Sequence, residues 1–157
     1  MFGRPSDVSP EAFAFLTLAM DYARGIRVLA ASRAPVIATM LFLRGWTLEF
    51  ALKSYLTHKS VAGETLKKDG HDLEKLWRRA VEKGLPVDPQ PPAYCKNHKD
   101  MLYRYRQGMA GTNAGPFSGT IVIGGRPGIA EELQVIVDAV GAEVAGEHYS
   151  HYRSQGL

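Results

Sequence analysis

The sequence PVIATMLFLRGWTLEFALKSYLTH occupies residues 35–58 and carries apolar side chains on more than one side of a helix. These are Val36, Ile37, Leu41, Phe42, Leu43, Trp46, Leu48, Phe50 and Leu52. A helix that is apolar nearly all round is buried nearly all round, so we predict a central helix here, or one shared with a second subunit. Arg44 interrupts this surface, as do Glu49 and Lys53, which are one turn apart in the favourable order for an ion pair.

Helical periodicity also dominates the segments on either side. Ser9 and Pro10 are typical of a helix start, and an apolar face recurs from there to about residue 31. Further helices are predicted over about 72–83, where Gly84 follows, over about 94–106, and from Pro127 to about 144. The links are a polar stretch at 60–70, a proline-rich connector at 87–92 and a glycine-rich loop at 108–128, which contains a short extended segment at 120–123. We therefore predict an all-α bundle of about five helices with one long loop.

Length and composition fit a single soluble domain. The chain has 157 residues, of which 45% are hydrophobic and 22% charged, and a net charge of +3. We expect a flexible segment at 1–8, one domain at 9–144 and a frayed tail at 145–157. The longest apolar run, 34–43, is too short to span a membrane, and residues 1–9 lack a signal pattern, so we expect a cytoplasmic protein.

The search for chemistry gives few candidates. Cys95 is the only cysteine, which excludes an internal disulfide and a multi-cysteine zinc site, and we expect no metal and no cofactor. His98 falls on the apolar face of the predicted 94–106 helix, where a core histidine is more common than a catalytic one. The basic residues around it, with Tyr103 and Tyr105, fit either a phosphate-contacting ridge or a solvated helix surface.

Two short motifs are the most distinctive feature of the chain. The first is LEFALKSYL at 48–56, and the second is GHDLEKL at 70–76, in which Asp72 can cap a helix. We expect a semi-buried polar cluster in which Glu49 and Lys53 of the first motif meet His71, Asp72, Arg104 and Tyr105. That cluster either fixes how the helices dock or holds a ligand or an RNA backbone.

The two motifs, in this order and spacing, resemble bacterial HEPN-like proteins (higher eukaryotes and prokaryotes nucleotide-binding fold). Leu102-Tyr-Arg-Tyr105 is similar to a later element of that family, although Arg106 stands where a proline often follows. The resemblance covers about 9–106. It implies an up-and-down helical core, a homodimer, and a toxin–antitoxin, stress or defence context, often with a nucleotidyltransferase-type protein partner.

The ribonuclease signature of that family is absent from this chain. It consists of an arginine followed by a histidine about four to six residues later, and no histidine here has an arginine that far before it in the sequence. The resemblance therefore implies a non-catalytic module. One alternative is a metal-independent ribonuclease that uses His98 with Arg104 or Arg106. Another is a small nucleotide-binding protein that uses Lys53, His71 and Arg104.

Overall fold

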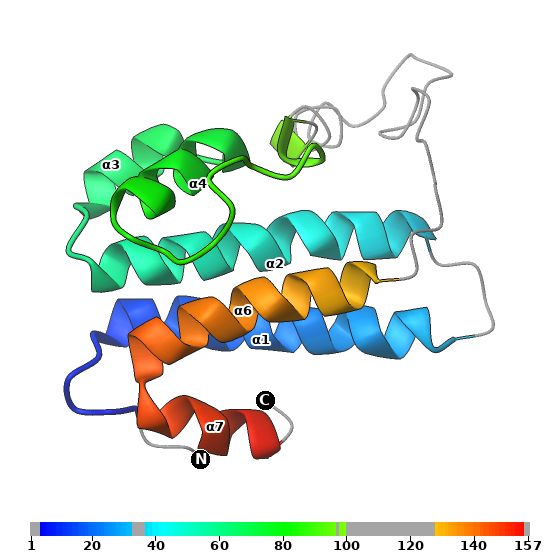
Figure 1. Ribbon diagram of the computed structural model, residues 1–157, viewed down its shortest axis with the longest axis horizontal. Coiled ribbons are helices and arrows are strands. Elements are labelled where there is room, and N and C mark those ends of the chain that lie inside the picture. Colours follow the sequence, from blue (N-terminus) through cyan, green and yellow to red (C-terminus); the bar gives the residue numbers. More distant parts are fainter. Residues whose placement is uncertain (1–3, 33–36, 97, 100–127, 156–157) are drawn as a thin grey trace.

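The computed structural model describes residues 4–32, 37–96, 98–99 and 128–155. Across these ranges the chain forms six helices and no strand, which confirms the all-α prediction: α1 Pro10–Ala30, α2 Ile37–His58, α3 Gly63–Asp69, α4 Leu73–Glu82, α6 Ile129–Ala145 and α7 Glu147–Ser154 (Figure 1). Residues 95, 96, 98 and 99 are also helical. The predicted extended segment at 120–123, most of the glycine-rich loop, and Arg104, Tyr105 and Arg106 lie outside the described residues. Among the described helices, none has the length and apolar character needed to cross a membrane.

Helix α1 begins where its capping residues predict. The Ser9 side chain accepts a hydrogen bond from the Ala12 backbone N–H at 3.1 Å, and Pro10 occupies the first turn, where its missing N–H costs nothing. One face of the helix is buried, formed by Ala12, Leu16, Ala19, Met20, Ala23 and Ile26. The predicted end at about residue 31 is correct to within one residue.

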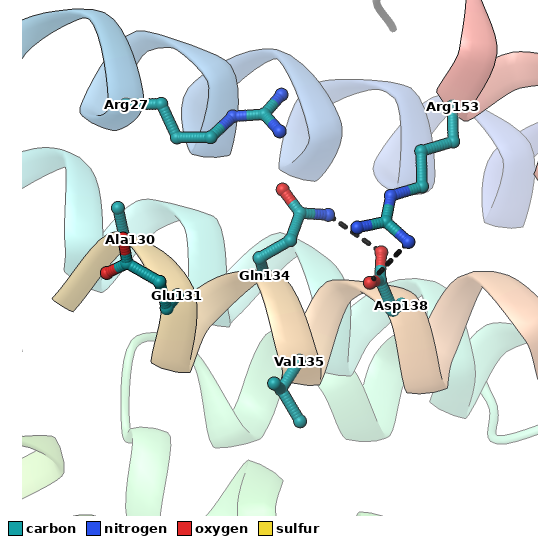
Figure 2. A pocket seen from close by; sticks show the side chains of 7 residues that line it. All are labelled: Arg27, Ala130, Glu131, Gln134, Val135, Asp138 and Arg153. Atoms are coloured by element: carbon teal, nitrogen blue, oxygen red, sulfur yellow. Dashed lines mark hydrogen bonds and ion pairs between the residues drawn. The ribbon is translucent and has the colours of Figure 1, made fainter. Parts of the chain in front are cut away.

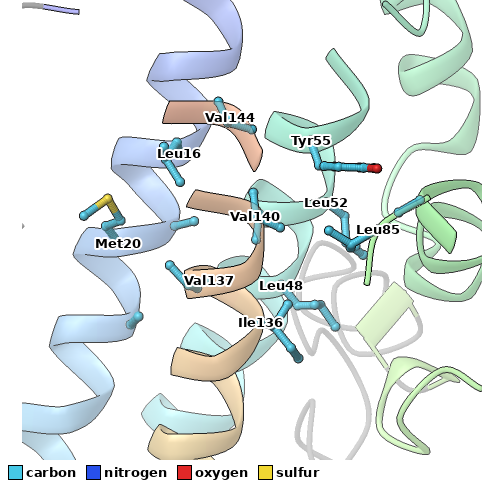
Figure 3. Packing of buried hydrophobic residues seen from close by; sticks show 14 of the residues in the cluster. Leu16, Met20, Leu48, Leu52, Tyr55, Leu85, Ile136, Val137, Val140 and Val144 are labelled. Atoms are coloured by element: carbon cyan, nitrogen blue, oxygen red, sulfur yellow. The ribbon is translucent and has the colours of Figure 1, made fainter. Parts of the chain in front are cut away.

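Helix α2 is the central element, as its many-sided apolar pattern predicts. It lies between the layer formed by α1 and α6 and the layer that contains α3 and α4 (Figure 1). Leu48, Leu52 and Tyr55 of α2 are fully buried, and they share a core with Val137 and Val140 of α6 (Figure 3). The Ser54 hydroxyl donates to the Ala12 carbonyl at 2.7 Å and links α2 to α1.

The predicted polar link at 60–70 is wrong, because residues 63–69 form α3. Leu66 buries its side chain against the core, and Asp69 pairs with Arg79 of α4 at 2.8 Å. One apolar anchor and one ion pair thus stabilise a helix too short to show a periodic pattern. Helix α4 begins after Asp72, whose side chain accepts from the Lys75 backbone N–H at 3.2 Å, and it ends before Gly84, which has a φ of +93°.

The tail predicted to fray from residue 145 instead continues from Ala145, the last residue of α6, into α7. Gly146 separates the two helices with a φ of +51°. Tyr149 and Tyr152 are buried, and the Tyr149 hydroxyl donates to Asp138 at 2.7 Å. Tyr149 thus anchors α7 on α6, and Tyr152 packs on Phe13 of α1 with ring centroids 5.5 Å apart, two contacts that the polar composition of 145–157 did not indicate.

Candidate functional site

A carboxylate lies inside the helical bundle. Glu49, in the middle of α2, is only 1% exposed and lies among apolar neighbours such as Leu48 and Leu52 on the same helix. Burial of an isolated carboxylate is very unfavourable, so such a group needs hydrogen-bond donors or a positive charge close by. Its surroundings therefore define the candidate site.

Three nitrogen donors from three segments surround the Glu49 carboxylate. Lys53, one turn along α2, donates its ammonium to Oε1 at 2.6 Å. The Nδ1 atom of His71, in the turn before α4, lies 2.9 Å from Oε2 and 3.0 Å from Oε1. The Nε2 atom of His98 lies 3.1 Å from Oε2. We call Glu49, Lys53, His71 and His98 the Glu49 cluster.

The Glu49 cluster keeps the carboxylate ionised. Burial is the largest single effect on the pKa of Glu49 and raises it, but the hydrogen bonds from His98, Lys53 and His71 together outweigh burial and lower the pKa below its ordinary value of 4.5. The hydrogen bonds from Lys53, His71 and His98 thus compensate the negative charge of the buried carboxylate.

The two imidazole rings of the cluster are held in place by α2. Trp46 makes edge contacts with both, with ring centroids 5.5 Å from His71 and 5.9 Å from His98. The His98 ring packs directly on Gly45, where any side chain would overlap it. His98 is 3% exposed, whereas the side chain of His71 is 27% exposed and connects the cluster to the surface.

The structure brings together three of the residues that the two motifs predicted. Glu49 and Lys53 of the first motif contact one another, and His71 of the second contacts Glu49. Asp72 has a different place: it caps α4, and its carboxylate lies 3.6 Å from the Lys75 ammonium and 3.9 Å from that of Lys99.

His98 is the member of the cluster that the motifs did not predict. Its apolar helix face indicated a core histidine bonded to a neighbour, and it is buried and hydrogen-bonded in this way. The sequence offered no sign that its neighbour is Glu49. Nor did it predict a metal-ligand set, yet Glu49, His71 and His98 each offer one ligand atom, and these atoms all lie within 4.8 Å of one another.

Half-buried aromatic rings extend from the cluster across α1 and α2. Trp46 stacks on Phe50 with centroids 5.4 Å apart, and Phe50 in turn contacts Phe15 at 6.0 Å and Tyr22 at 5.6 Å. Phe42 also contacts Trp46, with ring centroids 6.2 Å apart. We call these five residues the aromatic row. Each ring retains some exposure to solvent, unlike the fully buried leucines of the core.

An open pocket of about 330 Å³ lies elsewhere, between α1, α6 and α7 (Figure 2). Its lining includes Arg27, Arg153 and Asp138, and Asp138 lies beside Arg153. Asp138 pairs with Arg153 at 3.0 Å and accepts from Gln134 at 2.7 Å. The acid of this pocket is thus already neutralised by residues of the chain itself, which fits a role in docking α7.

The Glu49 cluster is therefore the strongest candidate site among the described residues. Comparison with known proteins adds no relative to this picture: no protein-family model matches the chain, and no curated protein or solved structure matches it significantly.

Proposed function

We propose that the chain is a non-catalytic HEPN-like helical module that forms a homodimer and serves as an accessory or partner-binding protein in a toxin–antitoxin, stress or defence system. The observation that supports this most directly is the contact between the two motifs that carry the resemblance. Glu49 of the first motif accepts from His71 of the second at 2.9 Å, so both motifs contribute to one buried cluster. Their spacing in the sequence thus corresponds to a contact in space.

The state of the Glu49 cluster supports a non-catalytic role. Lys53, His71 and His98 already satisfy the carboxylate, and His98 has almost no contact with solvent. A general base has to approach the proton that it removes to within hydrogen-bond distance. A buried imidazole bonded to a buried carboxylate is better suited to hold α2 against the neighbouring segments.

The aromatic row supports dimerisation. Aromatic residues are enriched at the centres of protein interfaces, and five half-buried rings on the adjacent helices α1 and α2 form a continuous apolar surface. A second copy of the chain packed on this surface would complete their burial. The resemblance also implies a nucleotidyltransferase-type protein as a further partner.

Sedimentation equilibrium tests the dimer. We expect the wild-type chain and Val135→Glu, which changes a residue of α6 that is 67% exposed, to sediment as dimers. Tyr22→Glu, which places a charge in the aromatic row, should sediment as a folded monomer. A wild-type chain that remains monomeric at high concentration, or a dimer that Tyr22→Glu leaves intact, contradicts this part of the proposal.

One observation favours the ribonuclease alternative: the carboxylate of Glu49 bonds the imidazole of His98, an arrangement that can orient a base. A sensitive cleavage assay on mixed RNA, with His98→Ala as control, decides between the two. We expect no cleavage by the wild-type chain. Cleavage that disappears in His98→Ala would establish the ribonuclease and overturn the non-catalytic assignment.

The nucleotide-binding alternative is tested by thermal shift. It relies on Lys53 and His71, both of which already bond Glu49, together with Arg104. A nucleotide present at about 100 times its dissociation constant would stabilise the fold by about 2.7 kcal/mol. We expect no such shift, and a shift that Lys53→Gln removes would favour this alternative.

A further inference from the structure

We propose that Glu49, His71 and His98, whose ligand atoms lie within 4.8 Å of one another, form a binding site for one Zn²⁺ ion. The inference goes beyond the proposed function and does not depend on it. In this arrangement the ion links the middle of α2 to the turn before α4 and to the helical residues 98 and 99.

Two of the three distances between the donor atoms are close to those of a zinc site, and all three are within 4.8 Å. Zinc lies about 2.0–2.2 Å from carboxylate oxygen and imidazole nitrogen, so two ligand atoms of a tetrahedral site are about 3.4 Å apart. Oε2 of Glu49 lies 2.9 Å from Nδ1 of His71 and 3.1 Å from Nε2 of His98. An outward shift of a few tenths of an ångström in each ring makes room for the ion.

Packing against neighbouring residues fixes the ligand side chains before any metal binds. Trp46 contacts both imidazole rings, and the His98 ring lies against Gly45. His71 follows Gly70, which has a φ of +60°, and precedes the residue that caps α4. Ligands whose positions are set by neighbouring packing lose little conformational entropy when a metal binds.

The types of donor atom favour a metal ion that accepts both nitrogen and oxygen ligands. Two imidazole nitrogens and one carboxylate oxygen suit Zn²⁺, whereas Mg²⁺ and Ca²⁺ prefer oxygen ligands alone. To bind the ion, each imidazole has to present the nitrogen that faces Glu49 without its proton. A water molecule that enters beside the partly exposed His71 supplies the fourth ligand.

Two features limit the affinity. The ammonium of Lys53 bonds Oε1 of Glu49 at 2.6 Å, so its positive charge lies close to the ion. Nδ1 of His98 is buried and has no hydrogen-bond partner among the described residues, so it lacks the acceptor that usually orients a ligating histidine. We therefore expect micromolar binding, weaker than that of a dedicated structural zinc site.

The first experiment uses the wild-type chain after chelator treatment. We expect Zn²⁺ titrated into it to bind with one-to-one stoichiometry by calorimetry. In nitrogen NMR spectra of the imidazole rings, the resonances of His71 and His98 should shift. Those of the exposed His148 and His151 should not. This readout needs no variant, so a folding defect cannot imitate or hide it.

The second experiment uses matched variants. His71→Ala, at the most exposed position of the cluster, should lower the Zn²⁺ affinity by about 100-fold or more. Lys53→Gln should raise it by about tenfold or more, because it removes the opposing charge and keeps a hydrogen-bond donor. The double variant His148→Gln, His151→Gln is the control for surface histidines and should bind as the wild type does.

Three results overturn the proposal. One is the absence of saturable Zn²⁺ uptake by the wild-type chain. Another is binding that His71→Ala leaves unchanged, and the last is a response confined to His148 and His151. A monomeric or an RNA-cleaving protein would contradict the proposed function but would not bear on the zinc site. Failure of the proposed function and failure of the zinc site can therefore be told apart.

Discussion

Nδ1 of His71 and Oε2 of Glu49 lie 2.9 Å apart although 22 positions separate the two residues in the sequence. The contact joins the turn before α4 to the middle of α2. Because Glu49 is almost completely buried and ionised, removal of one partner leaves a charge without its hydrogen bond in an apolar environment. We therefore predict that this pair contributes to the docking of α4 on α2.

A double-mutant cycle between Glu49 and His71 measures this docking contribution. We expect Glu49→Gln, His71→Ala and the double variant to show a coupling energy of about 1–3 kcal/mol in the free energy of unfolding. Urea denaturation of the four proteins provides the measurement. Additive effects of the two substitutions would refute the docking role of the contact.

Stability should fall with acidification through the titration of Glu49. The folded state lowers the pKa of Glu49 below 4.5, so its contribution to stability is complete above about pH 4.5 and is lost as the pH falls through the lowered value. Urea denaturation at pH values on both sides of 4.5 measures the loss. Glu49→Gln should show a shallower dependence over this window than the wild type, and an identical slope in both proteins would contradict the assignment.

Gly45 should not tolerate a side chain, because a Cβ there would overlap the buried His98 ring. We expect Gly45→Ala to reduce the free energy of unfolding by about 1–3 kcal/mol. Gly63→Ala is the matched control: no atom lies within 4 Å of its new Cβ, so its effect should be neutral or stabilising by up to about 1 kcal/mol. Equal effects at the two positions would show that His98 does not occupy this place.

Gly141 leaves room on α6 for the ring of Tyr149 from α7, just as Gly45 leaves room on α2 for the ring of His98. An added Cβ would overlap the ring of Tyr149, which is otherwise buried on α6. Gly141→Ala should therefore release α7, and hydrogen exchange of the backbone amides of 147–154 should become much faster while that of α2 changes little. Unchanged protection of α7 would mean that Tyr149 does not anchor it.

Cys95 should be unreactive in the folded protein. It is 2% exposed, and burial, the largest effect, raises the pKa of its thiol to about 12. Only about one thiol in ten thousand is then ionised at about pH 8, and the thiolate is the reactive form. Ellman's reagent should label Cys95 rapidly in urea and very slowly without it, whereas rapid labelling of the native chain would contradict this burial.

Local signals in the sequence determined the all-α class and most helix limits. Ser9 and Pro10 set the start of α1, and the many-sided apolar pattern of 35–58 indicated that α2 is central. Each of these signals lies within a single helix, in its capping residues or in the periodicity of its side chains. The helix limits and the central position of α2 could therefore be predicted without knowing how the rest of the chain packs.

Only the tertiary structure decided where His98 lies, that 63–69 and 147–154 are helical, and which ligand atoms gather around Glu49. The bond between Glu49 and His98 spans 49 positions, and its formation depends on how whole helices pack. Short helices such as α3 and α7 have little stability of their own and form because Leu66, Tyr149 and Tyr152 are buried against neighbours. Packing of this kind leaves no local pattern in the sequence.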